Sequence, residues 1–159
     1  IDEIIAVDDH ELIVNFLDMM ENHKMLVENS GLLTVAALKH LDCKGKKIVS
    51  ILSGGNMDVI TLSSVVQHGL IERGRVFTVS VQLPDRPGEL VNVANVIAKL
   101  KGNVIRLEHN QFVSINRNSA VELRITLEAF GHEHKKEIIV ALRNHGYDPK
   151  EESPTGLYE

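Results

Sequence analysis

The chain has 159 residues, of which 43% are hydrophobic and 25% charged, and its formal net charge is −5. This length allows one ordinary domain or two small ones, and the composition is that of a globular protein rather than a disordered or collagen-like chain. The acidic balance argues against nucleic acid as a partner, because phosphate backbones select basic faces. No apolar run approaches the roughly 20 residues that span a bilayer, so we expect no membrane partner either.

Cysteine and histidine offer little for catalysis or metal binding. Cys43 is the single cysteine, which excludes an intrachain disulfide and predicts a reducing, cytoplasmic location. His132 and His134 stand two apart on an expected helix, where they point to different faces as solvated surface residues, so no metal site is expected. The first residues lack a signal-peptide pattern and position 1 is not Met, which indicates an excised piece.

The first 75 residues alternate between strand and helix signals. A short apolar cluster over Asp2–Val7 predicts a strand. The nearly continuous apolar run Lys47–Leu52 predicts a second strand, covered on both faces as in a parallel sheet. Helical spacing predicts three helices: one through Leu12, Phe16, Met19 and Met20 after cap chemistry at Asp8-Asp9, one over about Ser30–Leu41, and one from Ile60 to Ile71. The order predicts an α/β segment.

From Val76 the apolar period changes to two, which is typical of strands with one buried face. The expected order is βαββαβ, the ferredoxin-like α+β arrangement, over residues 76–150. Residues 151–159 have too few apolar side chains to order themselves and are expected to form a flexible tail. The expected elements are a strand over Phe77–Leu83, a helix over Leu90–Leu100, a strand over Val104–Phe112, a turn over Ser114–Asn118, a strand over Val121–Glu128, a helix around Ile138–Leu142 and a short strand from Tyr147.

A glycine-rich turn, Ser53-Gly54-Gly55-Asn56, follows the expected Lys47–Leu52 strand. This is the position at which open α/β sheets bind ligands, although a turn without any ligand has the same composition. Together with the upstream Leu26–Gly31 sequence, it closely resembles the C-terminal end of the catalytic domain of serine/threonine dehydratases. These enzymes, also called threonine ammonia-lyases, are pyridoxal phosphate enzymes of fold type II. The resemblance runs from Ile1 to Arg75.

The resemblance implies roles for three residues. The serine of the motif hydrogen-bonds the pyridine nitrogen of pyridoxal phosphate, a role that would fall on Ser53, with Gly54 beside it in the cofactor site. A neutral hydroxyl leaves that nitrogen unprotonated, and the ring is then a modest electron sink. Glu28 matches a glutamate at the border of the active site, although a carboxylate at a helix start is equally expected there.

The resemblance also implies that catalytic parts lie outside this sequence. The family binds its cofactor through a Schiff-base lysine and holds the phosphate with a separate glycine-rich loop, and neither motif occurs here. No catalytic residue is therefore assigned within the chain. We predict that the chain alone, without that lysine as nucleophile and base, neither binds the cofactor stably nor converts threonine to 2-oxobutanoate and ammonia.

A second motif, Asp85-Arg86-Pro87-Gly88-Glu89-Leu90, joins the first expected strand of residues 76–150 to its helix. Pro87 favours an extended Arg86, and Gly88 opens a helix whose free amides attract an anion. From Phe77 onward the sequence resembles the ACT regulatory domain, in which this loop binds small effectors. That resemblance implies effector contacts from Asp85, Arg86, Pro87, Gly88, Glu89 and Leu90, and from Asn103 on the second strand of a neighbouring copy. Branched-chain amino acids and adenine nucleotides both remain open as effectors.

Three functions remain open from sequence. The first is a fragment of a threonine dehydratase with an allosteric ACT domain, which forms a homodimer through Phe77–Tyr147. The second is a free-standing ACT-type ligand-binding or oligomerisation module without enzymatic activity. The third is a nucleotide-binding α/β protein that uses Gly54-Gly55, although a full dinucleotide fingerprint is missing.

Overall fold

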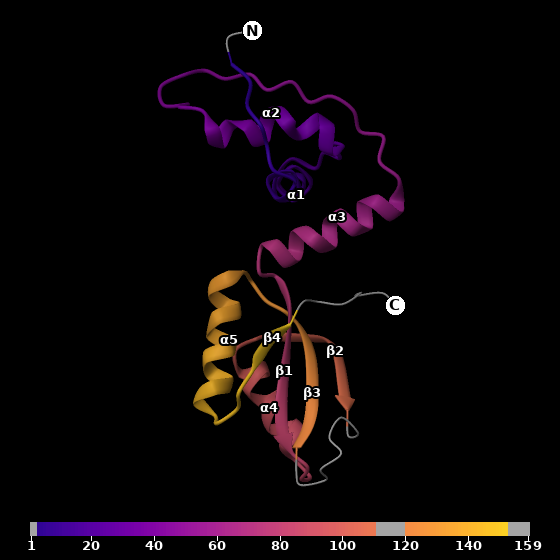
Figure 1. The fold of residues 1–159 in the computed structure, drawn as a ribbon, viewed down its shortest axis with the longest axis vertical. Coiled ribbons are helices and arrows are strands. Elements are labelled where there is room, and N and C mark those ends of the chain that lie inside the picture. Colours follow the sequence, from indigo (N-terminus) through magenta and orange to yellow (C-terminus); the bar gives the residue numbers. More distant parts are fainter. Residues whose placement is uncertain (1–2, 111–119, 153–159) are drawn as a thin grey trace. The chain divides into compact units, whose positions relative to one another are not determined.

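The computed structural model describes residues 3–110 and 120–152. The chain divides into two compact units, Ile1–Glu72 (unit 1) and Arg73–Glu159 (unit 2). Figure 1 shows that the described part of unit 1 contains helices and long irregular segments, whereas unit 2 is built on a sheet. The molecule is therefore α+β in its observed content.

The first helix of unit 1, α1 (Asp9–Asp18), follows the cap predicted at Asp8-Asp9, with Asp8 as the capping residue and Asp9 as the first residue of the helix. The Asp8 carboxylate accepts the amide of His10, and the Glu11 carboxylate accepts the amide of Asp8, which completes a capping box. A π-helical turn, η1 (Met19–His23), continues it and ends at Lys24, whose φ of 57° is left-handed. The predicted helix and its cap are confirmed.

The second predicted helix, Ser30–Leu41, is helical but broken into short pieces. The third predicted helix is confirmed as α3 (Val59–Glu72). The pieces of the second helix are the 3-10 turn η2 (Asn29–Leu32), α2 (Leu33–Ala36) and the 3-10 turn η3 (Ala37–His40). Together these helices enclose a small core of buried side chains from Leu12, Phe16, Met19, Val27, Leu32, Ala36 and Val65.

The two strands predicted in unit 1 do not form, and this corrects the α/β expectation for residues 1–75. Neither Glu3–Val7 nor Lys47–Leu52 lies in a strand. Instead of being covered on both faces, Val49 is 88% exposed and Ile51 is 74% exposed. The physical reason is that a strand needs a neighbour, and the described residues of unit 1 supply no other strand to pair with it.

Unit 2 contains one four-stranded antiparallel sheet in the order β2-β3-β1-β4. Along the chain the elements follow one another as strand, helix, strand, strand, helix and strand. Their bounds are β1 (Val76–Pro84), α4 (Glu89–Lys99), β2 (Asn103–Asn110), β3 (Ala120–Glu128), α5 (His132–Asn144) and β4 (Lys150–Glu152). The βαββαβ order predicted from the sequence is confirmed.

Apolar and polar residues alternate along the strands of this sheet, so one face is apolar and the other is polar. Val79, Ile125 and their same-face neighbours pack with apolar side chains of α4 and α5 into one buried core, and Figure 1 shows both helices on the same side of the sheet. The other face is polar, since Thr78 and Thr126 lie opposite one another and their hydroxyls are 3.0 Å apart. The core therefore lies between the sheet and its two helices.

The end of unit 2 differs from the sequence prediction. The last strand starts after Pro149 rather than at Tyr147, because the Tyr147 amide closes α5 by donating to the Leu142 carbonyl. Glu151 and Glu152, expected in the flexible tail, lie in β4 and form ion pairs with Lys135 and Arg124. Backbone pairing and these charges order a segment that lacks apolar side chains. The predicted Ser114–Asn118 turn and residues 153–159 lie outside the described residues.

His134 is a second correction, because it is held at both ring nitrogens rather than solvated. Its Nδ1 accepts the Phe130 amide at 3.0 Å, and its Nε2 lies 2.7 Å from the Leu100 carbonyl, to which it donates. The ring also stacks on Phe130, with centroids 4.7 Å apart. His134 therefore ties the start of α5 to the end of α4.

Candidate functional site

The two segments predicted to border a cofactor lie side by side in unit 1. The Glu28 amide donates to the Gly54 carbonyl at 3.3 Å. A Cβ atom on Gly31 would stand only 1.9 Å from the Ser53 carbonyl oxygen, so the two backbones touch where glycine leaves room. Gly31 and Ser53, which are 22 residues apart in the sequence, are thus brought into direct contact.

The three predicted cofactor residues are consequently brought together. The Glu28 carboxylate fills the space beside Gly54, where a Cβ atom would lie 2.3 Å from Oε1. The Ser30 hydroxyl donates to Glu28 Oε1 at 2.8 Å and so fixes the direction of the carboxylate. Ser53 is exposed next to them. Ser30 was missed in the sequence, although its position two residues after Glu28 is a common one for a side-chain hydrogen bond.

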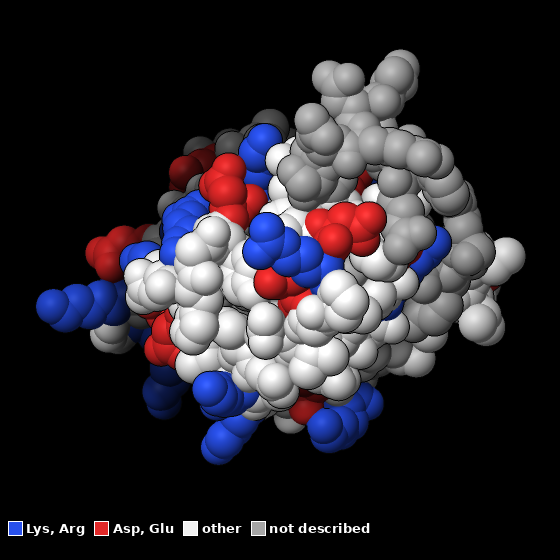
Figure 2. Space-filling model, turned by 90° about the horizontal axis from the view of Figure 1, so that it is seen from below, with Lys and Arg blue, Asp and Glu red and all other residues white. Residues whose placement is uncertain are grey.

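The effector loop predicted in unit 2 borders a cavity of about 320 Å³. Figure 2 views the molecule from the lower end of Figure 1, where the β1–α4 loop lies, and acidic and basic side chains are interspersed there. The cavity is lined by Leu83, Pro84, all six loop residues from Asp85 to Leu90, His109 and Val121. Its volume lies at the lower end of the range for small-molecule pockets.

The backbone of this loop is arranged by its proline and glycine. Gly88 has a φ of 98°, a conformation that L side chains rarely adopt, and it precedes the first residue of α4. The Arg86 amide donates to the Pro84 carbonyl at 2.8 Å, which tightens the turn. Among the residues that the structure describes, no side chain caps this end of α4, so the loop combines a tight turn with helix amides that carry no side-chain cap from those residues.

The charges that line the cavity have both signs. Asp85 and Glu89 are acidic, whereas Arg86 is basic, and His109 adds an imidazole ring. The Tyr147 hydroxyl donates to Glu89 Oε2 at 3.4 Å from behind the loop. Partial burial, and then the Glu89 charge, raise the pKa of Tyr147 above its ordinary range. The cavity therefore offers partners for both an ammonium and a carboxylate group.

Asn103, the remaining predicted effector residue, does not line this cavity. Its side-chain amide donates to Glu128 Oε2 at 3.2 Å. The prediction assigned it to the strand of a neighbouring copy, and it stays a prediction. His109 lines the cavity within the same chain, which the sequence did not indicate, because the bulge between Val104 and Arg106 sets the register of β2.

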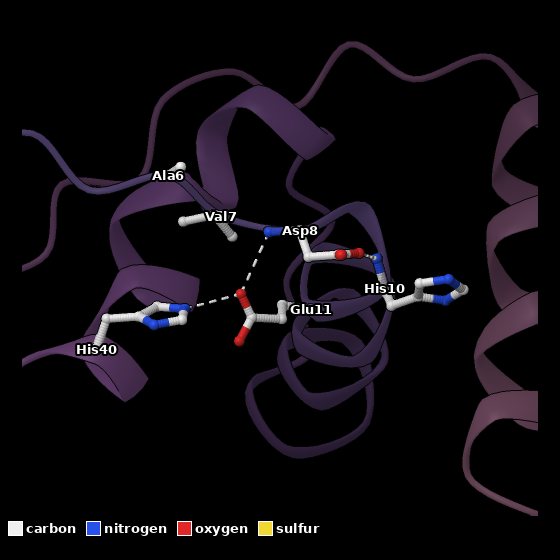
Figure 3. A pocket seen from close by; sticks show the side chains of 6 residues that line it. All are labelled: Ala6, Val7, Asp8, His10, Glu11 and His40. Atoms are coloured by element: carbon white, nitrogen blue, oxygen red, sulfur yellow. Dashed lines mark hydrogen bonds and ion pairs between the residues drawn. The ribbon is translucent and has the colours of Figure 1, made fainter.

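A second, more open cavity lies at the start of α1 (Figure 3). Its lining consists of Ala6, Val7, Asp8, His10, Glu11 and His40. Here the Glu11 carboxylate lies 2.9 Å from His40 Nε2 and also accepts the Asp8 amide. These hydrogen bonds hold the pKa of Glu11 below its ordinary range. Asp8, Glu11 and His40 are thus engaged with one another, as expected of a structural link between α1 and η3, and the His10 ring lies 3.3 Å from the Glu72 carboxylate.

Comparison with known proteins identifies the family to which this chain belongs. No family model matches the chain. The L-threonine ammonia-lyase of Geobacter sulfurreducens is 37% identical over 150 residues, which make up 92% of this chain and 37% of that protein. The L-threonine ammonia-lyase of Thermotoga maritima is 33% identical over 149 residues, with 93% and 37% covered. This chain is a relative of the threonine ammonia-lyases.

The similarity extends to the biosynthetic members of that family. The L-threonine dehydratase biosynthetic IlvA of Pasteurella multocida is 27% identical over 152 residues, which cover 93% of this chain and 28% of that protein. The predicted resemblance to the C-terminal part of a threonine dehydratase is therefore confirmed. The chain spans about a third of the length of its threonine ammonia-lyase relatives. A Bacteroides thetaiotaomicron protein of known structure aligns with 49% of the chain at a TM-score of 0.35 and 19% identity.

The residue types that unit 1 brings together are chemically compatible with the cofactor that the threonine ammonia-lyase resemblance implies. Ser53 offers a neutral hydroxyl, the Glu28 carboxylate is oriented by Ser30, and Gly54 carries no side chain between them.

Residues 3–110 and 120–152 contain no group of three or more His, Cys, Asp or Glu side chains suited to a metal ion. Within those same ranges, no helix has the length and apolar character required to cross a membrane.

Proposed function

We propose that this chain acts within a pyridoxal-phosphate-dependent threonine ammonia-lyase, which converts threonine to 2-oxobutanoate and ammonia. Unit 1 contributes contacts to the cofactor ring, and unit 2 is an ACT domain that binds a small effector. The proposal is supported by two relatives of that name, which align with more than nine-tenths of the chain. It is supported further by the side-by-side placement of Glu28 and Ser53.

The regulatory half of the proposal rests on the cavity at the β1–α4 loop. A βαββαβ unit with an antiparallel sheet is compatible with a ferredoxin-like ACT domain, but the fold alone does not imply ligand binding. The observation that carries the proposal is that every residue of the predicted effector loop, Asp85–Leu90, lines one cavity. A branched-chain amino acid fits its mixed charges and size; adenine nucleotides are the alternative effector.

In the catalytic half, the Ser53 hydroxyl would donate a hydrogen bond to the pyridine nitrogen. When bound, pyridoxal phosphate supplies the electron sink for removal of the α-proton and the β-hydroxyl of threonine. Glu28, held by Ser30, would border the active site near the cofactor ring. The sequence motif of the Schiff-base lysine, which the resemblance implies as the proton acceptor, does not occur in this chain, so we predict that the chain alone has no threonine ammonia-lyase activity.

The edge strand β2 provides a surface for the proposed homodimer. It pairs with β3 on one side, and its apolar side chains Val104, Ile105 and Leu107 are 37%, 48% and 41% exposed. Such an edge is normally covered, and a second copy is a suitable partner. Pairing of two β2 strands brings Asn103–His109 of each copy toward the effector loop of the other.

Calorimetric titration of the chain with isoleucine, valine, AMP and ADP tests the ligand. We expect saturable binding of an amino acid, at one site per chain. The Gly88→Val variant should lose that binding, because valine is strained at a φ of 98° although nothing lies within 4 Å of its Cβ position. Binding that is unchanged in this variant, or no binding of any of the four compounds, would contradict the effector site.

A further inference from the structure

We propose that His134 couples the effector loop, Asp85–Leu90, to the segment Arg73–Arg75, by which the chain enters unit 2. The inference rests on the proposed function, because it describes how binding at that loop would be communicated to the rest of a threonine ammonia-lyase. The coupling follows a route of contacts within unit 2, from α4 through the His134 ring to the turn between β3 and α5.

The first part of the route is helix α4. It begins directly after Gly88, whose carbonyl accepts the Asn92 amide at 3.0 Å. Its other end is closed by the Gly102 amide, which donates to the Ile97 carbonyl at 3.1 Å. The 11 residues of α4 span about 16 Å. Because the helix is hydrogen-bonded along its length and its inner face lies in the buried core, a displacement of its first turn also displaces its last turn.

The second part of the route is the hydrogen bond between His134 and the end of α4. The ring Nε2 donates to the Leu100 carbonyl at 2.7 Å and so links residues 34 apart in the sequence. A shift of Leu100 by about 1 Å away from the ring, a size seen for helices in regulated proteins, would break this bond unless the ring follows. The bond is therefore either kept, so that the ring moves, or lost. Two discrete arrangements of this kind are what coupling between distant sites requires.

The same ring holds the turn between β3 and α5. The His134 Nδ1 accepts the Phe130 amide at 3.0 Å, and the two rings stack with their centroids 4.7 Å apart. The Phe130 side chain is 77% exposed, so its own burial contributes little to fixing the turn. The imidazole supplies a hydrogen bond and a stacking contact instead. A ring that follows Leu100 therefore also displaces Phe130.

The last part of the route is the contact of this turn with the segment Arg73–Arg75. The Ala129 amide donates to the Arg75 carbonyl at 2.8 Å. A Cβ atom on Gly74 would lie 2.7 Å from His132 Nδ1, so the Gly74 backbone lies directly against the His132 ring. These two contacts flank the part of the turn that the imidazole holds. A movement of the turn is consequently passed to the segment by which the chain enters unit 2.

A double-mutant cycle tests the route without any ligand. Gly88→Val strains the effector loop, because Gly88 has a φ of 98°, and deuterium exchange of the Ala129 amide reports on the far end. We expect Gly88→Val to change that exchange rate about fivefold or more in the wild-type chain, and less than about twofold in the His134→Ala background. Equal changes in both backgrounds, or no change in either, overturn the proposal. An equal change at Leu123, in the middle of β3, also overturns it, because it would indicate only a loss of overall stability.

Two further variants divide the link into its halves. His134→Asn keeps an acceptor for the Phe130 amide but is too short to reach Leu100, whereas His134→Gln keeps a donor for Leu100 but lacks the ring. Each should lose the coupling as His134→Ala does, because the route needs both contacts. His145→Ala is the matched control, since the His145 Nδ1 lies 2.8 Å from the Ala141 carbonyl of α5 itself. Full coupling in either half variant, or lost coupling in the control, contradicts the assignment.

Titration with isoleucine connects the route to regulation. In the wild-type chain, saturating isoleucine should change the Ala129 exchange rate about fivefold or more. The His134→Ala chain should still bind isoleucine but show no such change. Binding to the wild-type chain without a response at Ala129 overturns the route and leaves the effector site standing. Absence of isoleucine binding would contradict the proposed amino-acid effector, and the ligand-free cycle would then decide the route by itself.

Discussion

Units 1 and 2 both contain apolar sequence patterns that predict strands, but the patterns lead to different structures. Unit 2 converts alternating residues into paired strands, and Val79 and Leu123 become fully buried. In unit 1 the strongest apolar run, Lys47–Leu52, stays exposed and unpaired. The difference teaches that a helix forms its backbone hydrogen bonds within its own segment, whereas a strand requires partners elsewhere in the chain.

The largest expected effect separates the two cores. Phe16 is fully buried in unit 1, and Ile125 is 1% exposed in unit 2. Truncation to alanine at either position should lower the stability of its own unit by about 3–4 kcal/mol and leave the other unit unchanged. Urea unfolding followed by amide NMR signals of each unit measures this. Equal loss in both units would show that they unfold together.

The same contrast explains what could be predicted from the sequence. A helix cap at Asp8-Asp9 and the βαββαβ order could be predicted because capping chemistry and alternation are local patterns. The irregular path of Lys47–Leu52 could not be predicted. Its apolar run indicates a strand suited to burial on both faces, but the run does not show whether the layers that would cover it are present. The ordering of Glu152 was missed because it comes from Arg124, 28 residues earlier, rather than from its own neighbours.

The candidate sites also differ in how far the sequence alone could predict them. The loop Asp85–Leu90 could be found from its proline and glycine, and it lines a cavity as a continuous piece. The contact of Gly31 with Ser53 depends on a backbone approach that a single sequence does not reveal. His109 joins the cavity only through the register of β2, which a bulge sets.

The second expected effect concerns the close backbone contact in unit 1. Gly31→Ala would place a Cβ atom 1.9 Å from the Ser53 carbonyl, so the segments must separate, at a cost of about 2–3 kcal/mol. Hydrogen exchange at the Glu28 amide, which donates to Gly54, should accelerate. Gly45→Ala is the control: nothing lies within 4 Å of its Cβ position, so only its left-handed φ of 73° contributes. Equal losses in the two variants would argue against the contact.

A smaller, stabilising effect is expected at one lysine in each unit. Lys24 and Lys101 have φ values of 57° and 63° at the ends of helical segments. Replacement by glycine relieves the strain of the left-handed conformation and should raise the stability of the corresponding unit by about 1 kcal/mol. Thermal unfolding of K24G and K101G measures the gain. A loss in either variant would show that the lysine side chain contributes more than the strain costs.

The smallest expected effect is a pH dependence of opposite sign in the two units. In unit 1, hydrogen bonds from His40 and the Asp8 amide lower the pKa of Glu11 below its ordinary value of 4.5. The stabilisation is therefore complete above that value and is lost as the pH falls through the lower folded pKa. In unit 2, burial and then Glu89 raise the pKa of Tyr147 above 10.0. Its contribution is complete below that value and is lost as the pH rises through the raised pKa.

Two substitutions isolate these contributions. Glu11→Gln should flatten the acid limb of the unit 1 stability profile, and Tyr147→Phe should flatten the alkaline limb of the unit 2 profile. Because Thr61 also lowers the pKa of Asp58 in unit 1, some acid dependence should persist in the first variant. Stability is measured from the same amide signals at each pH. An acid limb that is unaltered in Glu11→Gln would show that the His40 link does not differ between the folded and unfolded states.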